Sequence, residues 1–151
     1  MSFVENLSKA QIFTGLSQDE LERIAALCQQ RTCNKDDTIL SEGETSRELF
    51  IIAQGMVEVS LSKAEEGPTP LINLGAGQVV GEMTLVDRGA RSATVKALND
   101  DTVLYVIPHG DFLKLCEADN HIGFIVMRNL AAEMSLKLRY HNIAEQMGVN
   151  E

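Results

Sequence analysis

The stretch Gly75-Ala-Gly-Gln-Val-Val-Gly-Glu-Met-Thr-Leu-Val-Asp-Arg-Gly-Ala-Arg-Ser-Ala-Thr-Val95 separates two β-rich runs of the chain. It replaces the tight turn of a hairpin, and a loop of such length inside a compact domain usually carries a function. Gly81 permits a turn or a close backbone approach, and residues 82–86 can form a helical turn whose N–H groups face an anion. Arg91 adds a planar fork of donors that suits a phosphate, and Ser92 adds a hydroxyl. The stretch therefore predicts an anion site between two strands.

Short β-rich runs lie on both sides of this loop, between Thr38 and Val106. Glycines and an Asn-Asp-Asp turn separate the runs, and no long helical pattern lies between them, which is typical of a sandwich or barrel. We expect an α+β, mainly β, fold in which residues 34–107 form one antiparallel β-roll. The expected strands are Thr38–Leu40, Leu49–Ile52, Met56–Leu61, Leu71–Leu74, Ala93–Ala97 and Thr102–Ile107.

Helices are expected before and after the roll. Ser17 and Glu20 have the spacing of a capping box, and apolar residues recur at helical spacing after them, which predicts a helix of about three turns. This helix would lie in a helical N-terminus formed by residues 1–33.

The C-terminal part, residues 108–147, also has helical patterns. Asp111 can cap a helix that follows Pro108. A longer amphipathic helix is expected from about Ile122 towards Met147, with an apolar stripe that includes Leu130, Met134 and Leu138. The whole chain, residues 1–151, is expected to form a single domain, because its length matches one domain and no linker-like stretch divides it.

The composition limits the class of partner. The formal net charge is −9, and the 13 Lys and Arg residues are scattered, so we expect no direct binding to nucleic acid. A small anion is still compatible, because charges are screened over about 8 Å and a few local donors can outweigh distant acids. No apolar stretch approaches the ~18 residues of a membrane span. The three cysteines lack zinc spacing, which predicts reduced thiols and a cytoplasmic location.

No residue pattern indicates catalysis. We find no nucleophile with a base, no Walker loop and no pair of acids at one site, so we expect no enzyme and no cofactor. His109, His121 and His141 are too scattered for a metal site and are interpreted as turn or surface residues. An enzyme remains an alternative.

Gly81-Glu82, followed by Arg91-Ser-Ala-Thr-Val95, resembles the phosphate-binding cassette of the cyclic-nucleotide-binding domain family, of the catabolite activator and protein kinase A regulatory subunit type. The resemblance spans nearly the whole chain. It includes the motifs Ile12–Leu16, Glu42-Gly43, Leu49–Gly55 and Leu74–Glu82. It implies a stand-alone regulatory or sensor domain with a β-roll and a short phosphate-binding helix.

The resemblance also implies roles for individual residues. Backbone N–H groups near Glu82 would cradle the cyclic phosphate, Arg91 would pair with its exocyclic oxygen, and the Glu82 carboxylate would accept a hydrogen bond from the ribose 2′-hydroxyl. Ser92 stands where catabolite-activator-type members carry a serine, which favours cyclic AMP over cyclic GMP. The ligand-binding residues implied are Gly81, Glu82, Met83, Thr84, Arg91, Ser92 and Ala93.

Signalling would depend on movement of the C-terminal helix. Leu85 resembles the apolar hinge contact of the family and would couple the site to that helix, while Arg139 and Tyr140 offer planar groups that could stack on the base. An effector protein or a second copy of the chain, bound through the same helix, is the expected partner.

Two features of the sequence depart from the family pattern. Ala90 stands where many members have proline, and Val80 replaces a common aromatic residue, but neither change removes a ligand-contacting group. Two alternatives stay open. Glu82 and Arg91 can form an ordinary surface ion pair, or the chain can be a degenerate β-roll that binds only another protein.

Overall fold

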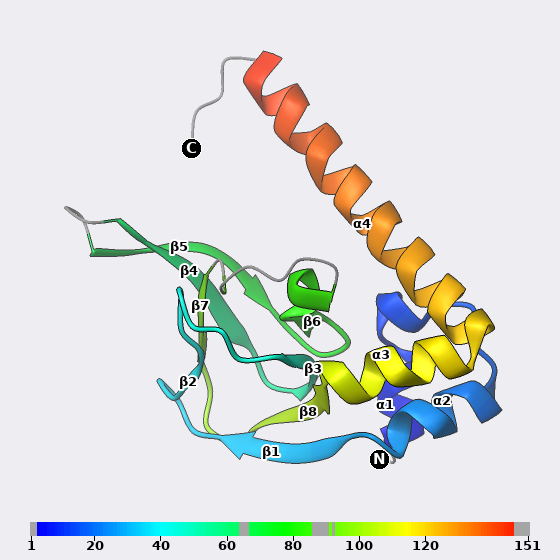
Figure 1. The fold of residues 1–151 in the computed structure, drawn as a ribbon. Coiled ribbons are helices and arrows are strands. Elements are labelled where there is room, and N and C mark those ends of the chain that lie inside the picture. The colour runs from blue at the N-terminus through cyan, green and yellow to red at the C-terminus, as the bar shows by residue number, and fades with distance from the viewer. Residues whose placement is uncertain (1–2, 64–66, 86–90, 92, 147–151) are drawn as a thin grey trace.

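The computed structural model describes residues 3–63, 67–85, 91 and 93–146, and Figure 1 shows a β-roll with helices gathered at one end. The strands are β1 (Gln29–Cys33), β2 (Thr38–Leu40), β3 (Glu48–Gln54), β4 (Val57–Lys63), β5 (Gly67–Leu74), β6 (Val79–Val80), β7 (Thr94–Ala97) and β8 (Thr102–Pro108). They form a first sheet in the order β1-β8-β3-β6 and a second in the order β2-β7-β4-β5, with antiparallel pairing throughout. The predicted antiparallel β-roll is confirmed.

The helices are α1 (Phe3–Ser8), α2 (Gln18–Ala25), α3 (His109–Ala118) and α4 (Asn120–Gln146), together with the 3-10 turns η1 (Gln11–Phe13) and η2 (Glu82–Leu85). The predicted capping box is present, because the Ser17 hydroxyl accepts from the Glu20 N–H and the Glu20 carboxylate accepts from the Ser17 N–H. In the described part of the chain, no helix is long and apolar enough to cross a membrane.

The central strands β3 and β8 are buried on both faces. Successive side chains of a strand point to opposite faces. Phe50 and Ile52 of β3 therefore pack inside the roll, while Leu49 and Ile51 pack against the helices. Leu104 and Val106 of β8 belong to the inner cluster, and Tyr105 and Ile107 belong to the outer one. The first sheet thus separates two hydrophobic cores.

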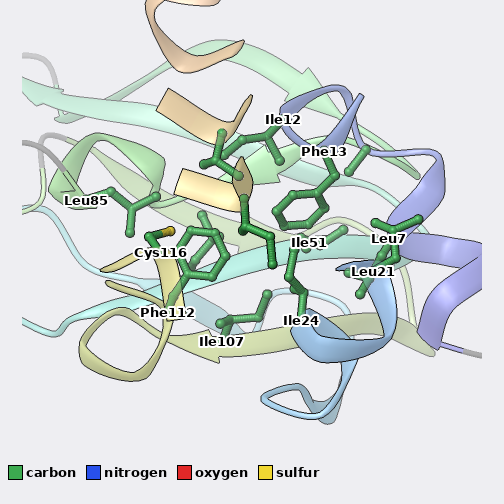
Figure 2. Close-up of a cluster of buried hydrophobic side chains, with 14 of the residues drawn as sticks. Leu7, Ile12, Phe13, Leu21, Ile24, Ile51, Leu85, Ile107, Phe112 and Cys116 are labelled. Atoms are coloured by element: carbon green, nitrogen blue, oxygen red, sulfur yellow. The ribbon is translucent and has the colours of Figure 1, made fainter. Parts of the chain in front are cut away.

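The outer core joins the helices at the two ends of the sequence. Leu7, Phe13 and Ile24, from the N-terminal helices, pack in the same cluster as Phe112 of α3, and Figure 2 shows these side chains converging over the sheet. Phe13 and Phe112 have ring centroids 6.1 Å apart. The N-terminal and C-terminal helices therefore form one layer.

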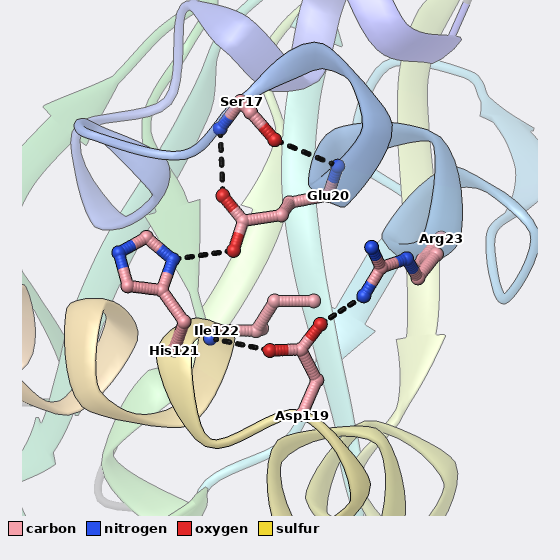
Figure 3. A network of polar contacts seen from close by, with 6 residues as sticks. All are labelled: Ser17, Glu20, Arg23, Asp119, His121 and Ile122. Atoms are coloured by element: carbon pink, nitrogen blue, oxygen red, sulfur yellow. Dashed lines mark hydrogen bonds and ion pairs between the residues drawn. The ribbon is translucent and has the colours of Figure 1, made fainter.

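Polar contacts fix α2 to the junction between α3 and α4 (Figure 3). One oxygen of Glu20 binds the α2 cap, and the other contacts the His121 ring. Arg23 pairs with Asp119, whose carboxylate also accepts from the Ile122 N–H at 3.3 Å. Hydrogen bonding to Ser17 and His121 lowers the pKa of Glu20. We call these residues the junction network.

Three boundaries differ from the sequence prediction. The helical N-terminus does not extend to residue 33, because Gln29–Cys33 pairs with β8 as strand β1. Helix α2 is shorter than expected and ends at Ala25. Asp111 does not cap α3, which already begins at His109 with Pro108 as its N-cap and no side-chain cap bond. The extended backbone of Pro108 makes the transition from strand to helix directly.

Candidate functional site

A pocket of about 800 Å³ opens between the second sheet and the segment that leads into η2. Its apolar wall comes mainly from β4 and β5, where Leu71 and Ile72 keep more than half of their surface exposed. Its polar end is formed by Glu82, at the start of η2, and by Arg91, which precedes β7. The residues that line it include Val59, Leu61, Leu71, Ile72, Leu74, Gly81, Glu82, Arg91, Ala93 and, from α4, Glu133.

Arg91 is a buried cation at the polar end of the pocket. Only 4% of the residue is exposed. Its guanidinium donates to three oxygens, through Nη2 to the Glu48 carbonyl at 2.7 Å, through Nη1 to the Gly81 carbonyl at 3.3 Å and through Nε to the Ser46 hydroxyl at 3.4 Å. Burial lowers the pKa of Arg91, although the nearby carboxylates of Glu44, Glu48 and Glu82 oppose that shift. The guanidinium stays charged at neutral pH, because arginine is not deprotonated in proteins.

The backbone of Arg91 is held as firmly as its side chain. Its N–H donates to the Glu44 carbonyl at 2.8 Å, and its carbonyl accepts from the Gly43 N–H at 2.9 Å. The Glu42-Gly43 motif therefore has a structural role, because this turn fixes where Arg91 enters the pocket. An arginine clamped at both its backbone and its guanidinium loses little entropy when an anion binds.

Gly81 must be glycine at this position. Its φ is +85°, a left-handed backbone conformation that costs side-chain-bearing residues energy. A Cβ built on it would lie 2.7 Å from the Glu48 carbonyl oxygen and 2.8 Å from Arg91 Nη1. The absence of a side chain therefore lets strand β3, Arg91 and the start of η2 meet closely.

The short helix expected at residues 82–86 is present as the 3-10 turn η2, Glu82–Leu85. Glu82, at its first position, is 9% exposed, lines the pocket and interacts electrostatically with Arg91. Leu85, at its last position, turns away from the pocket and packs beside Phe112 and Cys116 of α3 (Figure 2). One turn of helix thus contacts the pocket at one end and the helical layer at the other.

His109 was not predicted to belong to this region. It was interpreted as a turn or surface residue, but it is 3% exposed and adjoins Arg91 and Gly81. Burial, with a further contribution from the charge of Arg91, lowers the pKa of His109 to about 4. No periodic pattern marks this position, because Pro108-His109-Gly110 has the composition of a turn. Its position after the buried strand β8 is the feature that could have indicated burial.

The other predicted residues fall into two groups. Ala93 lines the pocket with Gly81, Glu82 and Arg91, so four of the predicted residues come together. Arg139 is an exposed residue of α4 and is not part of the pocket. Met83 and Thr84 lie in η2 and Tyr140 lies in α4, but their side chains are outside the described part, as is the whole of Ser92.

The described residues include no group of three or more His, Cys, Asp and Glu side chains placed to hold a metal ion. The three cysteines, Cys28, Cys33 and Cys116, are free thiols. Burial raises the pKa of Cys28 to about 12 and the pKa of Cys116 to about 11, so both are protonated and unreactive at neutral pH.

Comparison with known proteins gives a consistent match to this fold. The family model described as "Cyclic nucleotide-binding domain" matches residues 30–119. The chain is 30% identical, over 128 residues, to the cyclic AMP receptor protein of Thermus thermophilus, covering 85% of this chain and 57% of that protein. The chain therefore spans little more than half the length of this curated relative.

Two solved structures are similar over most of the chain. The catabolite activator protein of Thermus thermophilus has a TM-score of 0.80 at 28% identity, with 91% of this chain and 62% of that chain covered. A cyclic nucleotide-binding domain from Methylobacillus flagellatus has a TM-score of 0.80 at 25% identity, with 95% and 82% covered.

Proposed function

Because the chain belongs to the cyclic nucleotide-binding domain family, we propose that its pocket binds cyclic AMP in preference to cyclic GMP. The observation that carries the proposal is the buried guanidinium of Arg91, which lines the pocket beside the carboxylate of Glu82 and opposite an apolar wall. A buried cation next to an apolar wall suits a ligand with an anionic group and a flat aromatic ring. A cyclic nucleotide has both.

Each part of the nucleotide has a proposed partner. Arg91 binds the cyclic phosphate, together with backbone N–H groups of Gly81, Glu82 and Met83. The Glu82 carboxylate accepts from the ribose 2′-hydroxyl, which explains why an acid stands beside a phosphate site. Leu71 and Ile72, which are 55% and 54% exposed, would be covered by the base. The preference for adenine is supported by Ser92 and by the Thermus relative, which is a cyclic AMP receptor protein.

Calorimetric titration with cyclic AMP and cyclic GMP tests the proposal. Arg91→Ala should weaken binding by about 2–5 kcal/mol, because the phosphate would be desolvated without its partner. Arg128→Ala is the matched control, since Arg128 is exposed on α4 over the Phe124 ring, 5.9 Å from its centroid. Equal affinities of the wild type and Arg91→Ala would show that the site is wrong.

The role of Glu82 has its own test. Glu82→Ala should cost about 1–3 kcal/mol of binding free energy with cyclic AMP, since one hydrogen bond to a charged acceptor is lost. The same substitution should change the affinity for 2′-deoxy cyclic AMP very little. An equal loss of affinity for both ligands would mean that Glu82 supports the fold of η2 and does not bind the ribose.

We further propose that α4 carries the signal. Leu85 links η2 to α3, and Leu130 joins α4 to the same core, so a shift of η2 on phosphate binding would reach α4. Leu136 and Leu138, which are 55% and 61% exposed, are proposed to contact an effector protein or a second copy of the chain. Amide hydrogen exchange over residues 122–147, with and without cyclic AMP, tests the movement. Equal exchange rates with and without cyclic AMP would mean that α4 does not move when the nucleotide binds.

The proposed role is binding and regulation in the cytoplasm, without catalysis. The relatives with this domain include receptor and regulatory proteins, and three free thiols fit a reducing compartment. Incubation with cyclic AMP should leave the nucleotide intact when it is followed by chromatography. Appearance of 5′-AMP in proportion to protein concentration would contradict this.

A further inference from the structure

We propose that His109 is a positioning residue of the nucleotide site, holding the Gly81 carbonyl so that the Glu82 N–H points into the pocket. The inference rests on the proposed function, because it assigns a task within the same site. It concerns a residue that neither touches the pocket nor belongs to the stretch between Gly75 and Val95.

The location of His109 makes it a fixed support. It is the first residue of α3, directly after the buried strand β8, and its backbone N–H donates to the Arg47 carbonyl at 3.0 Å. Its side chain is buried and is not part of the pocket wall. The imidazole therefore adjoins Gly81 without lining the pocket, and α3, the helix that His109 begins, packs against η2.

The Gly81 carbonyl accepts hydrogen bonds from two side chains of the protein. The His109 ring makes a hydrogen bond to the Gly81 backbone, and this bond acts to raise the pKa of the ring. A bond with that effect is one in which the ring N–H donates, so the Gly81 carbonyl is the acceptor. Arg91 Nη1 donates to the same carbonyl at 3.3 Å. Two donors on one oxygen fix the direction in which that carbonyl points.

The direction of the carbonyl determines the direction of the next N–H. Residues 81 and 82 share one peptide unit, and the described chain contains no cis peptide bond. In a planar trans peptide the C=O and the N–H point in opposite directions. With the Gly81 oxygen turned towards His109, the Glu82 N–H points away from His109, and its inferred direction is towards the pocket that Gly81 and Glu82 line. That N–H is one of the proposed phosphate donors.

Arg91 alone would be a weaker support, because its guanidinium must also reach the ligand. Its 3.3 Å bond to Gly81 is also longer than its 2.7 Å bond to the Glu48 carbonyl. His109 has no such competing task. The charged groups that act on His109 are Arg91 and Arg47, both cations. A neutral imidazole supplies its donor there without adding a third positive charge.

Two variants separate a lost donor from lost packing. His109→Phe keeps a flat ring without a donor and should weaken cyclic AMP binding about tenfold, the effect of one hydrogen bond. His109→Gln restores N–H donors and should bind within about threefold of the wild type. His121→Phe is the matched control, because His121 is exposed at the junction network, and it should leave affinity unchanged.

The outcomes are distinguishable. A wild type that fails to bind any cyclic nucleotide overturns the proposed function and this inference with it. A wild type that binds, together with a His109→Phe variant of equal affinity or a His109→Gln variant as weak as His109→Phe, overturns this inference alone. Thermal unfolding of each variant without ligand checks that affinities are compared between folded proteins.

A measurement on the wild type covers the case in which His109→Phe does not fold. Nitrogen-15 NMR at pH 7 should show a neutral His109 ring with one protonated nitrogen whose proton exchanges slowly with water. The Glu82 amide should be among the signals most shifted by cyclic AMP. A ring proton that exchanges at the solvent rate, or a Glu82 amide that does not respond to saturating ligand, overturns the inference.

Discussion

Replacement of Gly81 by alanine tests the geometry of the site most directly, because two separate costs fall on one methyl group. The first is conformational. At a φ of +85° an alanine is strained by about 1–2 kcal/mol relative to glycine. The second is steric, since the new Cβ would lie 2.7 Å from the Glu48 carbonyl oxygen and 2.8 Å from Arg91 Nη1.

Neither neighbour can move freely. The Glu48 carbonyl belongs to β3 and already accepts from Arg91 Nη2, so relief requires Arg91 to turn and give up its bond to Gly81. A lost hydrogen bond adds about 1 kcal/mol. We therefore expect Gly81→Ala to lower the free energy of unfolding by about 3 kcal/mol. For a chain of this size that corresponds to a fall in melting temperature of roughly 6–12 °C.

Two other glycines are controls for the separate costs. Gly43 has a φ of +87° but no atom within 4 Å of a built Cβ, so Gly43→Ala should show the conformational cost alone, about 1–2 kcal/mol. Gly110 has neither feature, and Gly110→Ala in the first turn of α3 should be neutral or slightly stabilising. Urea unfolding measures all three. A Gly81→Ala variant no less stable than Gly43→Ala would refute the close approach of β3, Arg91 and η2.

Three further predictions concern stability. As pH falls from 6.5 to 4, the free energy of unfolding should decrease by up to about 3 kcal/mol, because His109 takes up a proton near pH 6.5 in the unfolded chain and only near pH 4 in the folded one. The His109→Gln variant should lack this decrease in acid titrations followed by circular dichroism. Ser17→Ala should cost about 1 kcal/mol in urea unfolding by removing the α2 cap, and an unchanged midpoint would contradict the capping box. Leu85→Ala should cost about 2–5 kcal/mol by calorimetry, and a cost below 1 kcal/mol would place Leu85 outside the core.

The sequence predicts the roll well where burial dominates. The runs around Leu49 and Thr102 are apolar at consecutive positions because β3 and β8 are covered on both faces, and this signal does not depend on distant contacts. Strand β1 was missed for the opposite reason. Residues Gln29–Arg31 are exposed and polar, and only pairing with β8 makes them a strand.

The candidate site also contains residues that the sequence predicts and residues that it does not. Glu82 and Arg91 could be predicted because the loop between two strands contains the residue types that a phosphate and a ribose need. The supports of Arg91 could not, since the carbonyl of Glu48 and the hydroxyl of Ser46 lie more than 40 residues earlier and have no distinctive spacing. His109 was missed because burial at the start of α3 follows from packing of helix against sheet and not from local pattern.

The double burial of β3 and β8 also bears on how the protein melts. Phe50 and Ile52 face one core, while Leu49 and Ile51 face the other, on the same seven-residue strand. Release of the helical layer would therefore expose half of the apolar side chains of β3 to water, and disruption of the roll would remove the surface on which that layer rests. The two halves form one cooperative unit, or foldon, and their most protected amides should exchange with a common free energy.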